Sequence, residues 1–244
     1  MQPKVSIIIP CYNSEKWIEQ ALTSALRQSW KNLEVIFVDN ESTDSSVAIA
    51  EKIKSEYPQL IMSGAKNIYP NCWDEARQKG FSLMSGDYVL VMGSDDYLHH
   101  EFIENCLRVI SFDPGKILAL QSPIRGVRGD DHIVVNEVAH KYKSLSEFKA
   151  QCLTKCPVNT PTVIYNTKLY YDGLLETKPD TYGGAADYDL YCKLAQERVM
   201  IYPVPHWMGF FYRWHPEQAT WKVQKEEKNY DKMIQNYWRE KWET

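Results

Sequence analysis

The sequence has no long hydrophobic run, and none approaches the roughly 20 apolar residues that a membrane-spanning helix needs. Its first ten residues contain one lysine and a short apolar segment that ends at Pro10, without the features of a secretory signal. Cysteine is sparse: the six cysteines are scattered, which fits buried thiols in a reducing compartment better than a disulfide framework. These absences predict a cytoplasmic protein.

Three glycine motifs are also missing. No G-x-G-x-x-G follows the first apolar segment, which argues against a dinucleotide-binding fold, and no G-x-x-x-x-G-K-[ST] marks a P-loop NTPase. The sequence also contains no G-x-S-x-G motif, which excludes a hydrolase whose nucleophile lies in such an elbow. The net charge of −4 argues against a nucleic-acid partner.

The first half of the chain alternates between strand and helix patterns. Apolar runs predict buried strands at residues 5–9, 33–38, 59–62 and 88–92. Between and after them, apolar positions at helical spacing predict helices within residues 17–26, 47–53, 71–84 and 99–110. Such alternation predicts an α/β fold with a parallel sheet and right-handed crossovers.

After residue 112 the regular alternation of strand and helix patterns ends. The pattern predicts strands at residues 117–121, 132–135 and 162–165, and an extended segment at 207–212. Helices are predicted at residues 146–153 and 187–196, and a basic loop at 125–128. The charged tail at residues 222–244 carries aromatic residues at helical spacing.

Polar residues follow three of the predicted strands, at residues 10–13, 39–44 and 93–96. Taken singly, such residues are helix caps. Taken together at the carboxyl edge of one parallel sheet, they favour a ligand site. The adjacent acids Asp95 and Asp96 repel each other, and a bound Mn²⁺ or Mg²⁺ offsets that cost.

These motifs resemble those of the family-2 glycosyltransferases. The matching segments are residues 5–13, 38–44, 76–77, 86–88, 94–96, 186–190 and 212–215. The resemblance is close over about the first hundred residues. Beyond them it is limited to short, separate segments. It implies a GT-A fold, which is a Rossmann-like, mainly parallel central sheet flanked by helices, with a smaller C-terminal acceptor-binding subregion. It also implies one domain of residues 1–244, made of a nucleotide-sugar-binding half (1–97), an acceptor-side half (98–221) and a helical tail (222–244).

The resemblance implies inverting transfer of a sugar from a nucleotide diphosphate sugar, with uracil as the expected base, to a glycan or lipid-linked glycan acceptor. The implied nucleotide-binding residues are Pro10, Tyr12, Asn13, Asp39, Arg77 and Ser94. Asp95 and Asp96 would bind the Mn²⁺ or Mg²⁺ cofactor, and Arg213 and His215 would contact the leaving diphosphate. Asp187 would be the catalytic base, although the same position would also suit a helix cap, and Asp189 would be structural.

Three positions depart from the family pattern. Gly93 replaces the first aspartate of the metal motif, so one potential metal ligand is missing. Ala186 replaces the acidic neighbour of the base, and Glu41 stands where a glycine is expected. The substitutions at Gly93 and Ala186 leave open a nucleotide-sugar-binding module without catalysis. A nucleotidyltransferase is a third interpretation, but the sequence lacks its glycine-rich basic loop.

The tail also has two interpretations. Its aromatic residues are Trp221, Tyr230, Tyr237, Trp238 and Trp242, which alternate with Lys and Glu. A helix could pack these side chains onto the domain. Alternatively, the tail could make peripheral contact with the inner face of a membrane, which would suit a lipid-linked acceptor.

Overall fold

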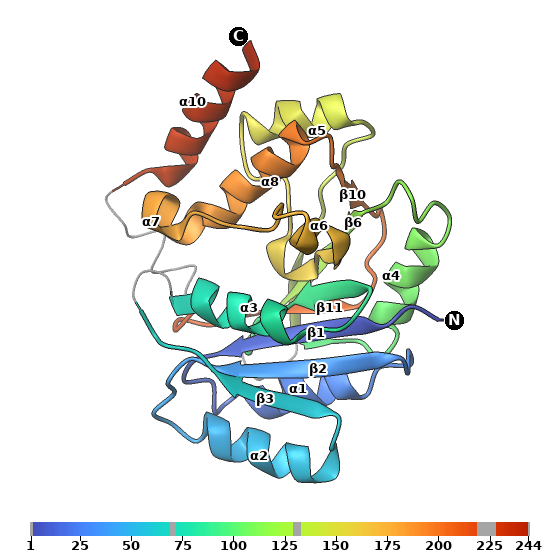
Figure 1. Ribbon diagram of the computed structural model, residues 1–244, viewed down its shortest axis with the longest axis vertical. Coiled ribbons are helices and arrows are strands. Elements are labelled where there is room, and N and C mark those ends of the chain that lie inside the picture. The colour runs from blue at the N-terminus through green and yellow to red at the C-terminus, as the bar shows by residue number, and fades with distance from the viewer. Residues whose placement is uncertain (1, 69–71, 129–132, 219–227, 244) are drawn as a thin grey trace.

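The computed structural model describes residues 2–68, 72–128, 133–218 and 228–243, which form two sheets with helices packed around them (Figure 1). The larger sheet has the spatial order β10 (Ile201–Pro203), β6 (Ala119–Gln121), β9 (Ile164–Asn166), β4 (Tyr88–Val91), β1 (Val5–Cys11), β2 (Leu33–Asp39) and β3 (Leu60–Gly64). The smaller sheet has the order β5 (Tyr97–Leu98), β11 (Phe210–Trp214), β7 (Ile124–Arg128) and β8 (Ile133–Val138).

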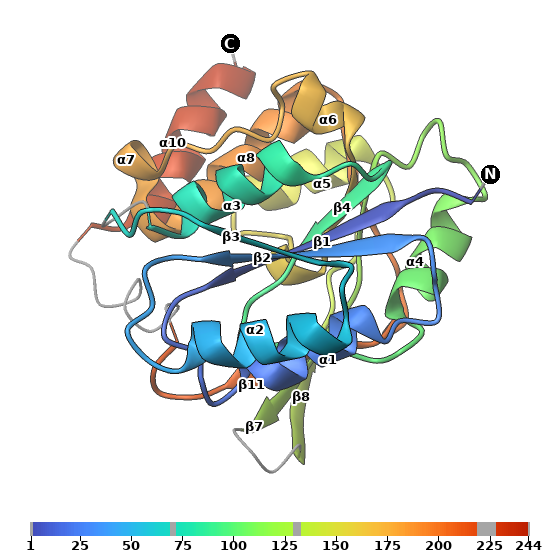
Figure 2. The same ribbon diagram turned by 60° about the horizontal axis from the view of Figure 1, so that its bottom comes forward.

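Helices cover both faces of the larger sheet, as Figure 2 shows. One face packs against α1 (Ile18–Leu26), α2 (Ser46–Glu56) and α4 (Phe102–Ile110). The other packs against α3 (Cys72–Leu83), α5 (Leu145–Cys152) and α8 (Ala186–Gln196). Because β1 is covered on both sides, its side chains alternate between two cores: Ile7 and Ile9 face one, and Ile8 faces the other.

The sheet is mainly parallel, as predicted. β1 pairs in parallel with β2 and β4, and β2 pairs in parallel with β3. The exception is β9, which is antiparallel to both β4 and β6. β9 enters the sheet from the opposite end, between two strands of the parallel set. The larger sheet is therefore mixed, with one antiparallel strand inside an otherwise parallel set.

The predicted basic loop at residues 125–128 is wrong, because these residues belong to β7. Strand β7 pairs with β8 and β11 and extends away from the larger sheet at the bottom of Figure 2. Its apolar residues Ile124 and Val127 are buried, whereas Arg125 is half-buried and lies over the Trp207 ring at 4.0 Å. The charges had suggested a loop, but they lie on an amphipathic strand.

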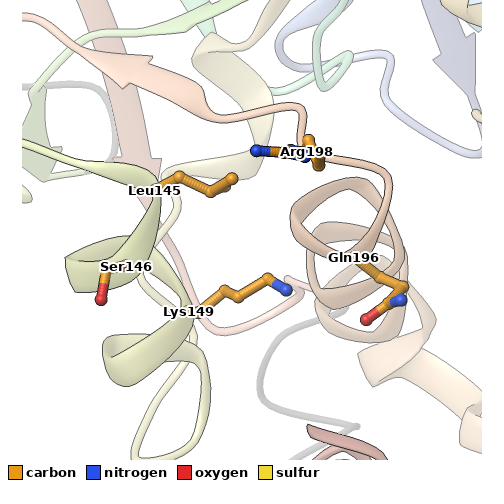
Figure 3. Close-up of a pocket in the computed structure, with 5 residues that line it drawn as sticks. All are labelled: Leu145, Ser146, Lys149, Gln196 and Arg198. Carbon is orange, nitrogen blue, oxygen red and sulfur yellow. The ribbon is translucent and has the colours of Figure 1, made fainter.

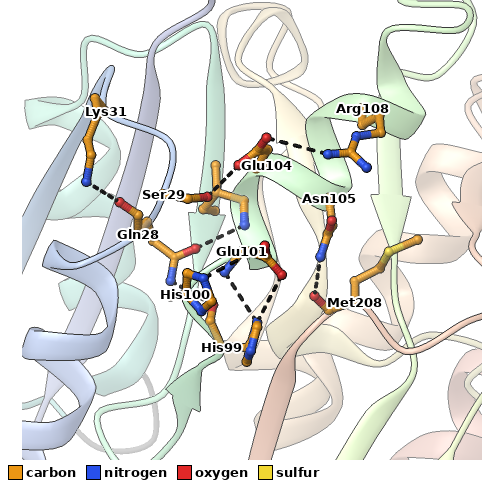
Figure 4. Close-up of polar contacts among 11 residues, drawn as sticks. Gln28, Ser29, Lys31, His99, His100, Glu101, Glu104, Asn105, Arg108 and Met208 are labelled. Atoms are coloured by element: carbon orange, nitrogen blue, oxygen red, sulfur yellow. Dashed lines mark hydrogen bonds and ion pairs between the residues drawn. The ribbon is translucent and has the colours of Figure 1, made fainter.

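The end of α1 is tied to the start of α4 by polar contacts (Figure 4). The buried Gln28 side chain donates to the His99 carbonyl at 2.9 Å and accepts from the Ile103 backbone N–H at 3.1 Å. The second contact satisfies an N–H group in the first turn of α4, which has no partner within the helix. This side-chain cap explains why α4 begins at Phe102 rather than at the predicted position 99.

The remaining helical elements lie in the last third of the chain: η1 (Thr160–Thr162), α6 (Lys168–Tyr171), α7 (Pro179–Tyr182), η2 (Gly183–Ala185) and α10 (Tyr230–Glu243). Helix α10 packs on α8 through the buried side chains of Ile234 and Trp238. Trp221 lies outside the described residues, as does the start of the tail. Among the helices in the described ranges, none is long and apolar enough to cross a membrane.

Candidate functional site

The three polar segments that follow β1, β2 and β4 meet at one edge of the sheet. The Asn13 side-chain oxygen accepts the Thr43 backbone N–H at 2.8 Å, which joins the first segment to the second. The Ser14 and Ser94 hydroxyls lie 2.6 Å apart, which joins the first segment to the third. The cap interpretation holds mainly for Asp44, which accepts the N–H of the first residue of α2 at 2.9 Å. These segments form one polar floor, and most of their side chains are not helix caps.

Two residues of this floor have left-handed backbone conformations. Asn13 has φ 49° and Glu41 has φ 61°. Asparagine tolerates this conformation, whereas glutamate is strained in it. The family pattern expects a glycine at position 41, and glycine adopts the left-handed conformation without strain. Glu41 occupies the position at a conformational cost. Its carboxylate accepts the Asn67 backbone N–H at 3.2 Å, which links the loop after β2 to the segment after β3.

The predicted nucleotide-binding residues line this floor to different extents. Tyr12 is 49% exposed beside the end of β1, where an aromatic ring can pack against a planar base. Pro10 and Asp39 are half-buried, and the Asp39 carboxylate accepts the Ser42 backbone N–H at 3.2 Å. Ser94 is buried beneath the floor, where it contacts Ser14.

Arg77 lies apart from these residues, on α3. It is 7% exposed and forms an ion pair with Asp74 at 2.6 Å. Its guanidinium also donates to the Thr177 hydroxyl at 2.8 Å and to the Leu175 carbonyl at 3.3 Å. Arg77 therefore connects α3 to the segment that leads into α8, and it brings a positive charge toward Asp187.

Asp95 and His215 form a polar pair beyond the end of β4. The Asp95 side chain is 28% exposed, and its carboxylate lies 3.0 Å from His215 Nε2. A Cβ atom on Gly93 would lie 2.5 Å from the other Asp95 carboxylate oxygen. Asp95 therefore points into the space that a side chain at position 93 would fill. The glycine that removes one potential metal ligand also makes room for the remaining one.

Asp96 and Arg213 lie below the site. The Asp96 carboxylate is 2% exposed and accepts the Arg213 backbone N–H at 2.9 Å. Burial, with the Asp95 charge as a second cause, raises the pKa of Asp96 well above its ordinary value. The Arg213 guanidinium is 1% exposed, lies 4.3 Å from the Trp17 ring centroid and donates to the Asp95 backbone carbonyl at 2.7 Å. Both side chains thus hold the Asp95 loop from inside the protein, and neither is open to a ligand.

Asp187 lies in the first turn of α8. Its Oδ2 accepts the Thr160 hydroxyl at 2.6 Å and its Oδ1 accepts the Tyr188 backbone N–H at 2.8 Å. Burial raises the pKa of this half-buried carboxyl, and these two hydrogen bonds and the Arg77 charge partly oppose the shift. Thr160 was missed by the sequence reasoning, because it precedes a proline in an irregular segment and carries no motif.

A shallow pocket of about 470 Å³ lies at the far end of α8 (Figure 3). Its lining includes Leu145, Ser146 and Lys149 from α5 and Gln196 and Arg198 from the end of α8. Gln196 follows Asp187 by nine positions in α8, which is roughly 13.5 Å along the helix axis. The pocket is therefore separate from the polar floor and from Asp187.

Residues 6–170 match the family model described as Glycosyl transferase family 2. Chondroitin synthase of Pasteurella multocida (strain Pm70) is 29% identical over 198 residues, which cover 80% of this chain and 19% of that protein. The poly(ribitol-phosphate) beta-N-acetylglucosaminyltransferase TarS of Staphylococcus aureus (strain MW2) is 25% identical over 181 residues, which cover 72% of this chain and 31% of that protein. The chain thus spans less than a third of the length of either relative.

Solved structures share the fold. S. aureus TarS 1–349 in complex with UDP-GlcNAc aligns with a TM-score of 0.69 and 22% identity, covering 92% of this chain and 62% of that one. The mannosyltransferase PcManGT from Pyrobaculum calidifontis, in complex with GDP-Man and Mn²⁺, aligns with a TM-score of 0.63 and 15% identity. That alignment covers 97% of this chain and 69% of the other. The α/β architecture predicted from the sequence is confirmed.

Proposed function

Because the chain belongs to glycosyltransferase family 2 and has the GT-A fold, we propose that it transfers a sugar from a UDP-linked donor to a hydroxyl of a glycan or lipid-linked glycan. The observation that carries the proposal is the meeting of the segments after β1, β2 and β4 at one carboxyl edge of the sheet. Ligands of open α/β sheets bind at such an edge. The similar TarS structure is a complex with UDP-GlcNAc, which supports the choice of a UDP-linked donor.

The exposed Tyr12 ring and the Asp39 carboxylate would hold the nucleotide base. A pyrimidine ring presents one N–H group, for which a carboxylate at this edge is a suitable acceptor. Pro10 and Asn13 would shape the floor below the base and ribose, and Ser94 would act through Ser14. Arg77, which is buried against Asp74, would act on the acceptor side of the site.

A divalent cation, Mn²⁺ or Mg²⁺, fits the chemistry of Asp95 and His215. The Asp95 carboxylate is partly open to solvent, and the position of Gly93 leaves space beside it. Within residues 2–68, 72–128, 133–218 and 228–243, no group of three or more His, Cys, Asp or Glu side chains could hold an ion. The donor diphosphate would therefore complete the coordination shell, and the ion would stabilise the charge of the leaving diphosphate.

Asp187 would act as the general base in a single displacement. The acceptor oxygen attacks the anomeric carbon, the bond from that carbon to the diphosphate oxygen breaks, and the acceptor proton passes to Asp187. Burial raises the pKa of this carboxyl, which improves its match to an alcohol proton while leaving it able to ionise. The element η1 contacts β4, and its Thr160 is hydrogen-bonded to Asp187. These contacts support a position of Asp187 beside the donor edge, where an acceptor hydroxyl would meet it.

Replacing Asp187 by Asn tests the mechanism. The Asp187→Asn variant keeps the shape of the side chain and loses the proton acceptor, so turnover is expected to fall by at least roughly 10²-fold. UDP affinity measured by calorimetry should stay within about a factor of three. Asp189→Asn is the matched control, because Asp189 lies on the same helix, is buried against Trp238 and should leave turnover unchanged. Near-wild-type turnover of Asp187→Asn would rule out this base. Binding of UDP without any sugar transfer by the wild-type protein would instead favour the binding module.

The division into donor half, acceptor half and tail stays a prediction, as does the cytoplasmic location. For the tail, the packing of Ile234 and Trp238 on the domain is observed. Contact between the tail and a membrane stays a prediction.

A further inference from the structure

The Asp187 carboxylate is held from two directions. The Thr160 hydroxyl, from η1, donates to Oδ2 at 2.6 Å. The Tyr188 backbone N–H, from α8 itself, donates to Oδ1 at 2.8 Å. These two donors belong to elements that are separate in the sequence, so the direction in which the carboxylate points depends on how η1 and α8 are packed.

Thr160 is fixed by the buried residue that precedes it. The Asn159 side chain donates to the Ser122 and Val138 carbonyls, both at 3.0 Å, and its backbone N–H donates to the Gln121 side chain at 2.9 Å. The Thr162 hydroxyl also donates to the Ser122 carbonyl, at 3.1 Å. The exposed Thr160 hydroxyl is therefore presented by a segment that is anchored to the end of β6.

A buried tyrosine lies behind Thr160. Tyr191 follows Asp187 by one turn of α8, so both side chains lie on the same face of the helix. Its hydroxyl lies near those of Thr160 and Tyr165 and has no hydrogen-bond partner of good geometry within the part of the chain that the structure describes. A threonine hydroxyl that donates to a carboxylate can still accept a hydrogen bond, so the Tyr191 hydroxyl has an acceptor within reach after a small movement.

We propose that Thr160 is a positioning residue for the general base: its hydroxyl orients Asp187 and stabilises the ionised carboxylate, and the Tyr191 hydroxyl supports Thr160 from behind. This inference rests on the proposed function, because it assumes that Asp187 accepts the proton of the acceptor hydroxyl.

The groups that face Asp187 make its charge sensitive to this hydroxyl. They are Arg77 from α3, Tyr165 from β9, Tyr191 from α8 and Cys156 from the segment after α5. Of these, only Arg77 is charged at neutral pH. Burial raises the pKa of Asp187, and the Thr160 hydrogen bond opposes that rise. Removing the hydroxyl should therefore raise the pKa of the base further.

The test compares the pH dependence of kcat in Thr160→Val and Thr160→Ser. Valine keeps the branched shape and lacks the donor, so the acidic limb of the profile is expected to move to higher pH by roughly half to one unit. Serine keeps the hydroxyl and should restore the wild-type limb. Tyr191→Phe should shift the limb in the same direction by a smaller amount. UDP affinity, measured by calorimetry, should match wild type in all three variants.

A wild-type pH profile in Thr160→Val would overturn the inference, as would an equal shift in Thr160→Ser. The Asp187→Asn variant separates this failure from failure of the proposed function. If Asp187→Asn is inactive and Thr160→Val has an unshifted limb, Asp187 is the base and only the role of Thr160 is lost. If Asp187→Asn keeps its turnover, the proposed base is lost and the inference falls with it. Should Thr160→Val fail to fold, the Tyr191→Phe profile decides, because an unshifted limb there removes the proposed support.

Discussion

Asp39 illustrates how one carboxylate at the end of a strand can serve both the fold and a ligand. Both oxygens of the group accept the Ser42 backbone N–H, at 3.3 and 3.2 Å, which closes the loop after β2. The residue is half-buried, and a carboxylate has lone pairs beyond those that one N–H group occupies. Under the proposed function, Asp39 would therefore connect loop geometry with base recognition.

Replacing Asp39 by Ala should weaken UDP binding by about 1.5–3 kcal/mol, the scale of a hydrogen bond to a charged group. Isothermal titration calorimetry of UDP with the two proteins measures this difference. Asp39→Asn retains one acceptor oxygen for the loop and should lose less affinity than the Ala variant. Equal affinities for wild type and Asp39→Ala would place the base elsewhere.

Glu41 is a second case in which one residue decides local energetics. Its left-handed backbone costs a residue with a Cβ atom about 1 kcal/mol relative to glycine. Both Glu41→Gly and Glu41→Ala lose the contact with the Asn67 N–H, so their difference isolates the backbone term. The Gly variant is expected to be the more stable by about 1 kcal/mol in denaturant unfolding. A more stable Ala variant would contradict the left-handed conformation.

At the scale of elements, α10 is docked on α8 by a polar contact inside an apolar interface. The Trp238 indole N–H donates to the buried Asp189 carboxylate at 2.7 Å. Trp242 makes a similar contact, donating to Gln196 at 2.7 Å, with the Lys149 ammonium 4.9 Å from its ring centroid. Burial raises the pKa of Asp189, and the Trp238 hydrogen bond and nearby lysines oppose that rise. We therefore expect the docking of the two helices to depend on pH.

The sign of this dependence follows from the raised pKa. The neutral form of Asp189 is favoured in the folded state, so its contribution to stability is fully present below about pH 4. That contribution is lost as pH rises through the folded-state pKa. The free energy of unfolding of wild type, relative to Asp189→Asn, is thus expected to fall as pH rises above about 4. Trp238→Phe should steepen the fall, because it removes a donor to the ionised form. Denaturant unfolding at several pH values measures this difference. If the free energies of unfolding of wild type and Asp189→Asn changed with pH in parallel, Asp189 would have no part in the pH dependence.

At the scale of the whole molecule, nucleotide and metal binding should be coupled. The polar floor spans β1, β2 and β4, whereas Asp95 and His215 bring together the end of β4 and the end of β11. A UDP molecule that contacts the floor and a cation at Asp95 would thus connect the two sheets. Each ligand would bind more tightly in the presence of the other, since linkage is reciprocal.

UDP with Mn²⁺ at about 100 times its Kd should stabilise the fold by roughly 2.7 kcal/mol and raise the Tm by roughly 5–10 °C. UDP in excess EDTA should give a clearly smaller shift, as should UDP with Mn²⁺ added to Asp95→Ala. Differential scanning calorimetry or dye-based thermal shift measures both. Equal shifts with Mn²⁺ and with EDTA would argue against a cation at Asp95.

The amino-acid sequence by itself determined the parallel half of the larger sheet and the identity of the family. Continuous apolar runs are compatible with strands buried on both faces, and β1, β2, β3 and β4 lie within about two residues of their predicted bounds. The strand-end motifs also predicted which segments would meet, because the carboxyl ends of parallel strands share an edge. These features depend on residues that are close in the sequence.

The tertiary structure alone decided the features that depend on distant residues. The antiparallel entry of β9, the amphipathic strand at residues 124–128 and the cap that Gln28 places on α4 each require a partner from another element. The same is true of the site. Asp96 and Arg213 carry charges that suggested ligand contact, and packing buried both below the Asp95 loop. Thr160 reaches Asp187 across 27 residues of chain, a distance over which local patterns carry no information.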